Sequence, residues 1–480
     1  MINKFSYNLP KNWVWTKLKE ISFIQGGYAF KSTDYSNSGV PLLRISNIKD
    51  CKVNFDQDTV FLDNAFIERC PDFQINKGDI LIALSGATTG KFGIYEKGEV
   101  ALLNQRVGRI KFYKASLDSS RFVFHYMDIL RKDILKQAYG AAQPNISTQE
   151  LGEFSLPLPP LPEQKRIVAK IEELFTKLDT GVEALKEIKK QLKRYRQAVL
   201  KYAFEGKLTE KWREANKNKL EPASVLLGKI KKENKTQEKY KEFQPVDTSN
   251  LSQLPRNWVW TRVGEIFKVA TGSTPDTSVA EHWNNGKIKW ATPKDLGKLS
   301  SPYIDDTERK ITQSGLDSCS AKIVPLNSLL ISTRAPIGYI AILADNIAFN
   351  QGCKALVNAN NNLVFIQYYY YLLLTRVNEM NLLGSGSTFK EISKDSIANI
   401  TIPFPPIPEQ HKIVEEIEKR FSVADKVEKT VDENIKQANR LRQSILKKAF
   451  EGKLVPQNPN DEPAEKLLER IKIKKVKQGR

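Results

Sequence analysis

The spacing of apolar residues divides the chain into segments with two different periods. Short runs of aliphatic and β-branched residues bounded by Gly, Asn and Asp are typical of strands. They occur at 80–82, 94–95 and 100–103, and again at 329–331 and 339–343. Stretches with apolar residues three and four apart follow at 119–139 and 363–381 and predict helices. Each half of the chain therefore predicts an α+β module.

A cluster of prolines ends each module, at 156–164 (LPLPPLPEQ) and 402–410 (IPFPPIPEQ). Proline is excluded from helix interiors and central strands, but Pro162 and Pro408 suit a first helical turn, where Glu163 and Glu409 would face the positive helix end. After the first cluster, the three/four spacing is broken only by Gly181. It runs through Ile167, Ile171, Leu174, Leu178, Leu185, Ile188, Leu192, Tyr195, Val199 and Tyr202. The pattern predicts a coiled-coil helix roughly 65 Å long.

A second long helix is predicted from a weaker seam in the same register. Its positions are Ile413, Ile417, Arg420, Ala424, Val427, Val431, Asn434, Ala438, Leu441 and Ile445. Two amphipathic helices in one chain can bury their seams against each other, and Asn434 would then set the register. An antiparallel pair would hold the two modules at opposite ends, related by a pseudo-two-fold axis. A helical hairpin inside an ordinary core is the alternative, which the length of the seam disfavours.

The two halves of the chain repeat each other at an offset of 245 to 246 residues. LPKNWVWT at 9–16 returns as LPRNWVWT at 254–261, both proline clusters match, and AFEGKL at 203–208 returns at 449–454. Asn104 and Gln105 return as Asn350 and Gln351. The ends of each unit repeat closely, whereas residues 26–100 and 272–345 share little beyond their hydrophobic pattern. Such a duplication indicates two similar modules with different specificities, although drift of surface loops would also produce it.

We therefore expect an α+β chain in six parts. Two modules, 1–157 and 251–403, are each followed by a helical region, at 158–208 and 404–454. A charged connector at 209–250 includes a short helix at 225–230 that would pack on the long helix. A basic tail occupies 455–480. The connector and the tail are open to a second interpretation, as solvated and partly disordered segments.

Composition limits what these modules do. The chain has 75 Lys and Arg against 55 Asp and Glu, a formal net charge of +20, which implies an anionic partner such as nucleic acid or an acidic membrane face. No apolar run is long enough to span a bilayer, and the N-terminus lacks a signal-peptide core. Four scattered cysteines suit a reduced, cytoplasmic chain, and the three histidines lack metal-ligand spacing.

Three near-matches to catalytic motifs fail on inspection. GATTGK at 86–91 has three residues between its glycines where a phosphate-binding loop needs four, and Phe92 follows its lysine. FPPI at 404–407 has Phe404 where an amino-methyltransferase needs Asn or Asp. GSGS at 384–387 opens no βαβ unit. Without a catalytic set, the basic charge and the two modules favour recognition of a bipartite site on double-stranded DNA, with half-sites about one helical turn (~34 Å) apart.

The repeated motifs resemble the specificity subunit of type I restriction-modification systems over essentially the whole chain. The resemblance rests on both LP(K/R)NWVWT openings, the GDILI strand, the Asn-Gln pairs, QPNIS at 143–147, both PPLPEQ/PPIPEQ junctions and both AFEGKL ends. It implies two target recognition domains, and helices that act as a ruler between half-sites and dock two methyltransferase subunits. It also implies that the chain is not catalytic and holds no cofactor. The methyltransferase partners would bring S-adenosylmethionine for adenine methylation, and restriction (translocase) subunits would bring ATP and Mg²⁺.

We expect DNA contacts from polar residues on loops that follow the strands of each module. In the first module these are Arg44, Ser85, Thr88, Thr89, Lys91, Asn104, Gln105, Arg106, Gln143 and Asn145. In the second they are Lys289, Lys294, Ser332, Thr333, Arg334, Asn350, Gln351, Lys354, Ser387 and Lys390. Arg44, Arg106 and Arg334 are the strongest candidates. The Asn-Gln pairs recur in both modules, so they suit a fold role or a backbone contact, and KEIS replaces PNIS in the second module.

Two other functional classes are compatible with parts of this pattern. A coiled-coil adaptor with incidental charge would behave independently of DNA sequence and of salt, whereas phosphate contacts make affinity fall steeply with salt. An autonomous methyltransferase would transfer methyl groups without a partner, which the missing cofactor and target-base motifs oppose.

Overall fold

A computed structural model describes residues 8–477, except 50, 57, 87, 114–117, 140–143, 236–241, 335, 359–362 and 387–389. The chain forms two compact units. Unit 1 comprises residues 1–185 and 432–480, and unit 2 comprises residues 186–431. Each unit contains one α+β domain and a part of each of two long helices, α5 (Leu161–Phe204) and α14 (Ile407–Phe450).

The domain of unit 1 is built on two sheets and a terminal strand pair. In the pair, β1 (Val14–Lys17) runs antiparallel to β13 (Ser155–Leu158). One sheet has the order β2 (Ser22–Gly26), β12 (Val107–Phe112), β9 (Ile80–Ala83), β10 (Phe92–Ile94), β6 (Cys51–Val53), β5 (Ile48–Lys49). The other has the order β3 (Tyr35–Ser36), β7 (Val60–Leu62), β4 (Val40–Leu43), β11 (Ala101–Leu103), β8 (Gln74–Ile75). Its helices before α5 are α1 (Leu18–Ile21), α2 (Ala65–Arg69), α3 (Ser120–Ala138) and α4 (Thr148–Gly152).

The domain of unit 2 repeats this plan with fewer strands. Its terminal pair is β14 (Val259–Arg262) with β23 (Thr401–Phe404). One sheet has the order β15 (Lys268–Thr271), β22 (Cys353–Val357), β19 (Leu329–Ser332), β20 (Ile340–Leu343), β17 (Tyr303–Ile304). The other has the order β18 (Arg309–Ile311), β16 (Ile288–Ala291), β21 (Ala348–Phe349). Its helices are α8 (Val263–Ile266), α9 (Pro293–Gly297), α10 (Gln313–Asp317), α11 (Ile366–Leu374), α12 (Val377–Leu383) and α13 (Lys394–Asn399).

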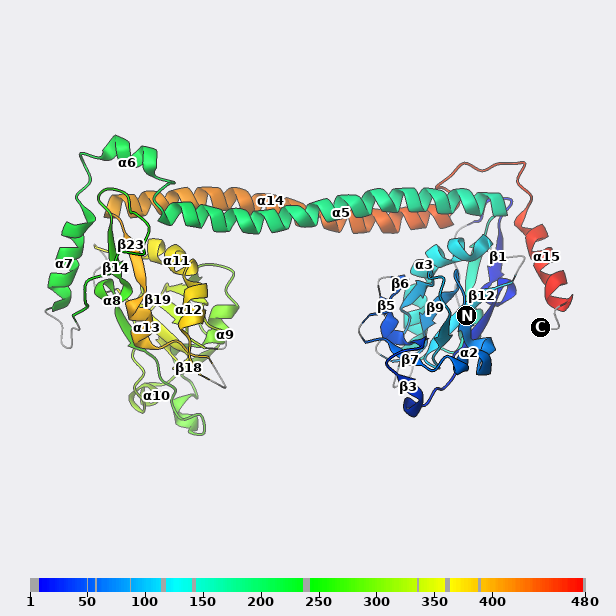
Figure 1. Ribbon diagram of the computed structural model, residues 1–480, viewed down its shortest axis with the longest axis horizontal. Coiled ribbons are helices and arrows are strands. Elements are labelled where there is room, and N and C mark those ends of the chain that lie inside the picture. The colour runs from blue at the N-terminus through cyan, green and yellow to red at the C-terminus, as the bar shows by residue number, and fades with distance from the viewer. Residues whose placement is uncertain are drawn as a thin grey trace. The chain divides into compact units, whose positions relative to one another are not determined.

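Most elements predicted from periodicity are confirmed. The runs at 80–82, 100–103, 329–331 and 339–343 form β9, β11, β19 and β20, and Ile94 ends β10. The helix predicted at 119–139 is α3, which lies between the sheet and α5 (Figure 1). The single helix predicted at 363–381 is wrong, because α11 ends at Leu374 and α12 begins at Val377. Arg376 between them has φ −96° and ψ 1°, outside the helical range.

Within each unit the long helices pack side by side and antiparallel. In unit 2, Lys189 pairs with Glu428 at 3.8 Å, and Arg196 pairs with Asp425 at 2.6 Å. In unit 1, the beginning of α5 (Ile167 and Ile171) shares a core with the end of α14, at Leu446, Ala449 and Phe450. Residue numbers therefore rise along α5 as they fall along α14. The predicted architecture of two α+β domains and two paired long helices is confirmed.

The predicted seam of α14 is wrong at Asn434. Asn434 is exposed, whereas Val431 is buried and Ile435 is half-buried. Val427 and Leu441, also assigned to the seam, are 39% and 46% exposed. A strict seven-residue pattern drifts by about 20° per heptad around a straight α-helix, so a seam extrapolated from one end leaves the buried face. Asn434 therefore does not set the register.

The connector and the C-terminal tail each contain a packed helix. After α6 (Glu210–Asn216), α7 (Ala223–Lys235) contacts α8, and α15 (Ala464–Lys477) contacts α1. Each begins at a repeated EPA and buries four apolar residues at matching positions, Ala223, Leu226, Leu227 and Ile230 in α7, and Ala464, Leu467, Leu468 and Ile471 in α15. In α15, charged residues of both signs separate the buried positions, and the four apolar residues belong to the unit 1 core.

The end of each repeat docks on the beginning of the other repeat. Gly206, from the first EGKL, faces Pro255, and Gly452, from the second, faces Pro10. Both glycines have a φ of +71°, which a side chain would strain, and an added Cβ would lie 2.4 Å from the proline ring. Trp13 and Trp258 are each 6% exposed and lie in the cores of their units.

Candidate nucleic-acid interface

In unit 1 the predicted contact residues other than Arg44 and Gln143 lie on three neighbouring loops. The loop between β9 and β10 is hydrogen-bonded to two others. The Leu84 N–H donates to the Arg106 carbonyl at 2.9 Å, and the Ile146 N–H donates to the Leu84 carbonyl at 2.9 Å. Residues 84–86, 88–91, 104–106 and 144–146 thus form one cluster, which we call the unit 1 loop cluster.

Internal hydrogen bonds fix the shape of this cluster. The Thr89 hydroxyl donates to the Gly86 carbonyl at 2.6 Å and lies 3.1 Å from that of Pro144, and Ser85 forms a β-bridge with Asn145. Thr89 is only 5% exposed. It therefore supports the loop instead of facing a ligand, whereas Ser85 and Thr88 are half-buried and Asn145 is exposed.

The two residues of the Asn-Gln pair have different roles: Asn104 belongs to the fold, and Gln105 lies at the surface. Asn104 is buried, its N–H donates to the Leu43 carbonyl at 3.1 Å, and its side-chain oxygen accepts from the Arg106 N–H at 3.4 Å. A Cβ on Gly27 would lie 2.1 Å from the Asn104 carbonyl, so the turn needs glycine there. Gln105 and Arg106 are exposed. Asn104 holds the turn that presents these two side chains.

A hollow of about 230 Å³ lies beside this turn. Its lining is Tyr35, Arg44, Ile45, Asn104, Gln105 and Arg106. The Arg44 guanidinium lies 5.9 Å from the centre of the Tyr35 ring. Sequence reasoning missed Tyr35, because it sits in a two-residue strand whose partner, β7, is distant in sequence. The hollow places two cationic side chains next to an aromatic ring.

Unit 2 repeats the backbone bonds of this cluster. The Thr333 N–H donates to the Gly352 carbonyl at 2.8 Å, and the Ile392 N–H donates to the Thr333 carbonyl at 3.1 Å. The Asn350 N–H donates to the Ala291 carbonyl at 2.9 Å, as Asn104 does to Leu43. The bridge between Arg334 and Glu391 matches that between Ser85 and Asn145, so the KEIS and PNIS loops are structurally equivalent.

Several residues predicted to contact DNA in unit 2 are turned inward. Ser332 and Thr333 have no exposed surface, and the Ser332 hydroxyl donates to the Pro336 carbonyl and accepts from the Tyr339 N–H, both at 2.8 Å. Lys354 is 5% exposed, and its Nζ is 3.2 Å from Glu391. The Ser332 and Lys354 side chains and the Thr333 backbone thus hold the loops together. Arg334 is half-buried and Gln351 is exposed, within the same cluster.

The remaining predicted residues are more dispersed. Lys289 on β16 pairs with Asp345, and this hydrogen bond raises the pKa of Lys289. Lys294 on α9 pairs with Glu308 at 2.9 Å, and the hydrogen bonds of Lys298 and Lys294 lower the pKa of Glu308 to about 2. Lys91 is exposed at the end of its loop, and Lys390 is exposed beside Glu391. Gln143 and Ser387 lie outside the described residues.

The exposed part of each cluster suits recognition of a nucleic acid. Arginine and amide side chains can bond two atoms of a base edge at once, and lysines neutralise phosphates. Among the described residues, no group of three His, Cys, Asp or Glu is placed to hold a metal ion, and none of the described helices is long and apolar enough to cross a membrane.

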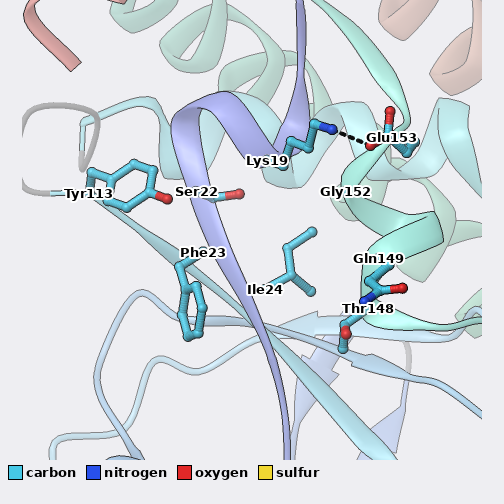
Figure 2. Close-up of a pocket in the computed structure, with 9 residues that line it drawn as sticks. All are labelled: Lys19, Ser22, Phe23, Ile24, Tyr113, Thr148, Gln149, Gly152 and Glu153. Atoms are coloured by element: carbon cyan, nitrogen blue, oxygen red, sulfur yellow. Dashed lines mark hydrogen bonds and ion pairs between the residues drawn. The ribbon is translucent and has the colours of Figure 1, made fainter. Parts of the chain in front are cut away.

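A separate pocket of about 600 Å³ in unit 1 contains none of the predicted contact residues. Figure 2 shows its lining, drawn from α1, β2, α4 and Tyr113, with Lys19 paired to Glu153. Two lysine hydrogen bonds, from Lys17 and Lys19, lower the pKa of Glu153 to about 2. The pocket is therefore not part of the candidate interface.

Comparisons with known proteins agree with this geometry. The family model "Type I restriction modification DNA specificity domain" matches residues 10–194 and 255–437. The EcoBI specificity subunit of Escherichia coli is 27% identical, over 98% of this chain and 94% of its own. The EcoKI specificity subunit of Escherichia coli K12 is also 27% identical, over 98% and 97%.

Two solved structures share the fold. A chain from a structure on complex assembly and conformational transition of the type I R-M system has a TM-score of 0.63 at 22% identity, over 93% of this chain and all of its own. The HsdS subunit from Thermoanaerobacter tengcongensis has a TM-score of 0.53 at 22% identity, over 94% and 100%.

Proposed function

Because this chain belongs to the type I restriction-modification DNA specificity family, in which the specificity subunit is not catalytic, we propose that its two domains read the two halves of one gapped DNA site. The loop cluster of each unit would face one half-site. The sequence between the half-sites would be passed over without being read.

The observation that carries this proposal is that the two loop clusters share a backbone arrangement but carry different side chains. Both units repeat the same backbone hydrogen bonds, yet Ser85 is replaced by Arg334, Arg106 by Gly352 and Asn145 by Glu391. Base readout depends on which donors and acceptors a loop presents. Two identical frames with different exposed groups would therefore recognise two different short sequences.

Within each cluster, the exposed or half-buried cations are the best candidates for direct contact. Arg44 and Arg106 border one hollow in unit 1, and Arg334 holds the equivalent bridge position in unit 2. Lys91, Gln105, Asn145, Gln351 and Lys390 complete the exposed set. The buried residues, including Thr89, Ser332, Thr333 and Lys354, would act by holding the loops.

The long helices would set the spacing and dock two methyltransferase subunits. Those subunits would bind S-adenosylmethionine and methylate one adenine in each half-site, and restriction subunits would use ATP and Mg²⁺. The antiparallel pairing of α5 with α14 supports this role, because a paired helix keeps its length where a single loop would not.

A methylome tests the proposal. The chain is co-expressed with its methyltransferase subunit in a host that lacks adenine methylation, and modified bases are mapped by single-molecule sequencing. We expect two short half-sites around a fixed run of unread bases, with one adenine modified on each strand. A continuous motif, or no motif from an assembled complex, would refute the two-domain reading.

A further inference from the structure

An apolar pocket of about 530 Å³ in unit 2 lies between α11 and α14. Its walls are Pro302, Tyr370, Tyr371 and Leu374 from the domain, and Glu418, Phe421, Ser422, Asp425, Lys426 and Lys429 from α14. Figure 1 shows α11 directly beside α14. None of the predicted DNA-contact residues lines this pocket, so DNA reading does not account for it.

The equivalent place in unit 1 is filled by a guanidinium group. At the repeat offset of 246 residues, Phe421 corresponds to Phe175 and Asp425 to Asp179. Arg442 lies over the Phe175 ring, 4.1 Å from its centre, and is bonded to Asp179. In unit 1, an arginine of the chain itself thus stacks on Phe175, the counterpart of the Phe421 ring that lines the pocket in unit 2.

In unit 2 the corresponding arginine has an additional carboxylate partner. Arg196 corresponds to Arg442, but it pairs with Glu428 at 2.9 Å as well as with Asp425 at 2.6 Å. Glu428 has no counterpart in unit 1, where Val182 holds its position. Arg196 is thus bonded to two carboxylates, and Phe421 lines the pocket.

A carboxylate in the pocket has also lost its partners. Glu418 corresponds to Glu172, which lies 3.3 Å from Arg121 and 3.7 Å from His125 in unit 1. Gln367 and Tyr371 stand at those two positions in unit 2. Within the described residues Glu418 forms no ion pair. Glu418 and Tyr371 line the same pocket, and burial, followed by the Glu418 charge, raises the pKa of Tyr371.

We propose that this pocket binds an arginine side chain of a methyltransferase subunit. A guanidinium stacks on aromatic faces and pairs with carboxylates, as Arg442 does in unit 1. The unneutralised Glu418 disfavours a phosphate or another anion. The exposed Lys426 and Lys429 at the rim suit acidic residues that flank the arginine. The inference rests on the proposed function for its partner, and it goes further in assigning the contact to unit 2 alone.

Binding of the purified methyltransferase subunit to the full chain tests this assignment, measured by titration calorimetry. Glu418→Gln removes the charge at constant shape, and Glu418→Lys reverses it. Both changes are at an exposed helix position, where folding tolerates them. Glu415→Gln is the matched control, because Glu415 is an exposed carboxylate on the same helix that pairs with Lys412 outside the pocket.

We expect one of two binding steps to weaken at least tenfold in Glu418→Gln and further in Glu418→Lys, with the other step and the control unchanged. Equal affinity of all variants would overturn the inference while leaving the proposed function in place. A wild-type chain that binds no methyltransferase subunit would count against the proposed function itself. A loss that Glu415→Gln shares would also overturn the inference, since it would show a general effect of charge.

Discussion

The indole nitrogen of Trp13 donates a hydrogen bond to Glu163 at 3.0 Å, across 150 residues of chain, and Trp258 repeats the bond to Glu409 at 2.8 Å. Each bond ties the residue just before the opening strand of a domain to the first turn of the long helix that follows the domain. The two glutamates differ in their other hydrogen-bond partners. Glu409 also accepts from Arg213 at 2.8 Å and from Thr209 at 2.7 Å, whereas Glu163 accepts from Gln457 at 2.6 Å.

Glu409→Ala should destabilise the protein more than Glu163→Ala. Glu409 is fully buried, so its removal leaves the Arg213 guanidinium, 13% exposed, without its carboxylate, at a cost of about 3–5 kcal/mol. Removal of Glu163 leaves two neutral donors, Trp13 and Gln457, without their acceptor, and should lower the free energy of unfolding by about 1–3 kcal/mol. Urea unfolding followed by circular dichroism gives both values. Equal losses would show that Arg213 does not depend on this carboxylate.

His125→Tyr should remove a pH dependence from the stability of unit 1. Burial lowers the pKa of His125 below 6.5, partly opposed by Glu172. The unfolded chain then binds a proton more readily than the folded one, so stability falls as pH drops below about 6.5, by up to about 1.4 kcal/mol per pH unit. Tyrosine occupies the equivalent position in unit 2, at Tyr371, and does not titrate in this range.

Thermal melting of the wild type and of His125→Tyr between pH 7.5 and pH 5.5 checks this sign. The difference between the two melting temperatures should change as the pH falls, in favour of the variant. Parallel curves over the whole range would show that the His125 ring gains a proton as easily in the folded state as in the unfolded one.

Arg44→Ala and Arg334→Ala should each alter a different half of the methylated motif. Arg44 lines the hollow beside the unit 1 loop cluster, and Arg334 belongs to the equivalent cluster of unit 2. Loss of a good base contact costs about 1–3 kcal/mol, roughly 10-fold to 100-fold in preference. Methylome mapping of the two variants reads out each half separately. Relaxation of the same half by both variants would contradict the assignment of one half-site to each unit.

Removal of one heptad from both long helices should shorten the unread spacer by about three base pairs, since seven residues rise about 10.5 Å. Residues 181–187 of α5 and 432–438 of α14 form a matched pair for such a deletion, because the Asp179–Arg442 and Lys189–Glu428 ion pairs lie on either side of them. A deletion in one helix alone should misregister the pair and abolish methylation. The motif is again mapped from modified genomic DNA, and an unchanged spacer would refute the ruler.

The duplication and the long helices were predictable because their signals are local or exact. Repeated motifs such as AFEGKL align without knowledge of the fold, and a helical seam needs only the spacing of neighbours along one element. The error at Asn434 marks the limit of that spacing. The exposed face of α14 is decided by where α5 lies, and small differences between 3.5 and 3.6 residues per turn accumulate over the length of the helix.

Burial of polar loop residues was not predictable in the same way. Ser332 ends a strand and Thr333 follows it, much as Ser85 follows β9, yet they are fully buried while Ser85 is half-buried. Their exposure depends on loops that arrive from positions 350–352 and 391–392, which no local pattern links to them. The docking of α15 on α1 also escaped prediction, because the two helices lie at opposite ends of the chain.

The sequence by itself determined that this protein is a tandem duplication of an α+β module and a long helix, with a strong positive charge and an overall resemblance to type I specificity subunits. Repetition, periodicity and composition are properties of the amino-acid sequence and can be recognised without knowledge of the fold. Only the tertiary structure decided which polar side chains face outward, that the end of each repeat closes on the start of the other, and that one unit keeps an open pocket where the other holds Arg442. Those features arise from contacts between residues far apart in sequence, where a single change such as Val182 to Glu428 gives a neighbouring arginine an additional carboxylate partner.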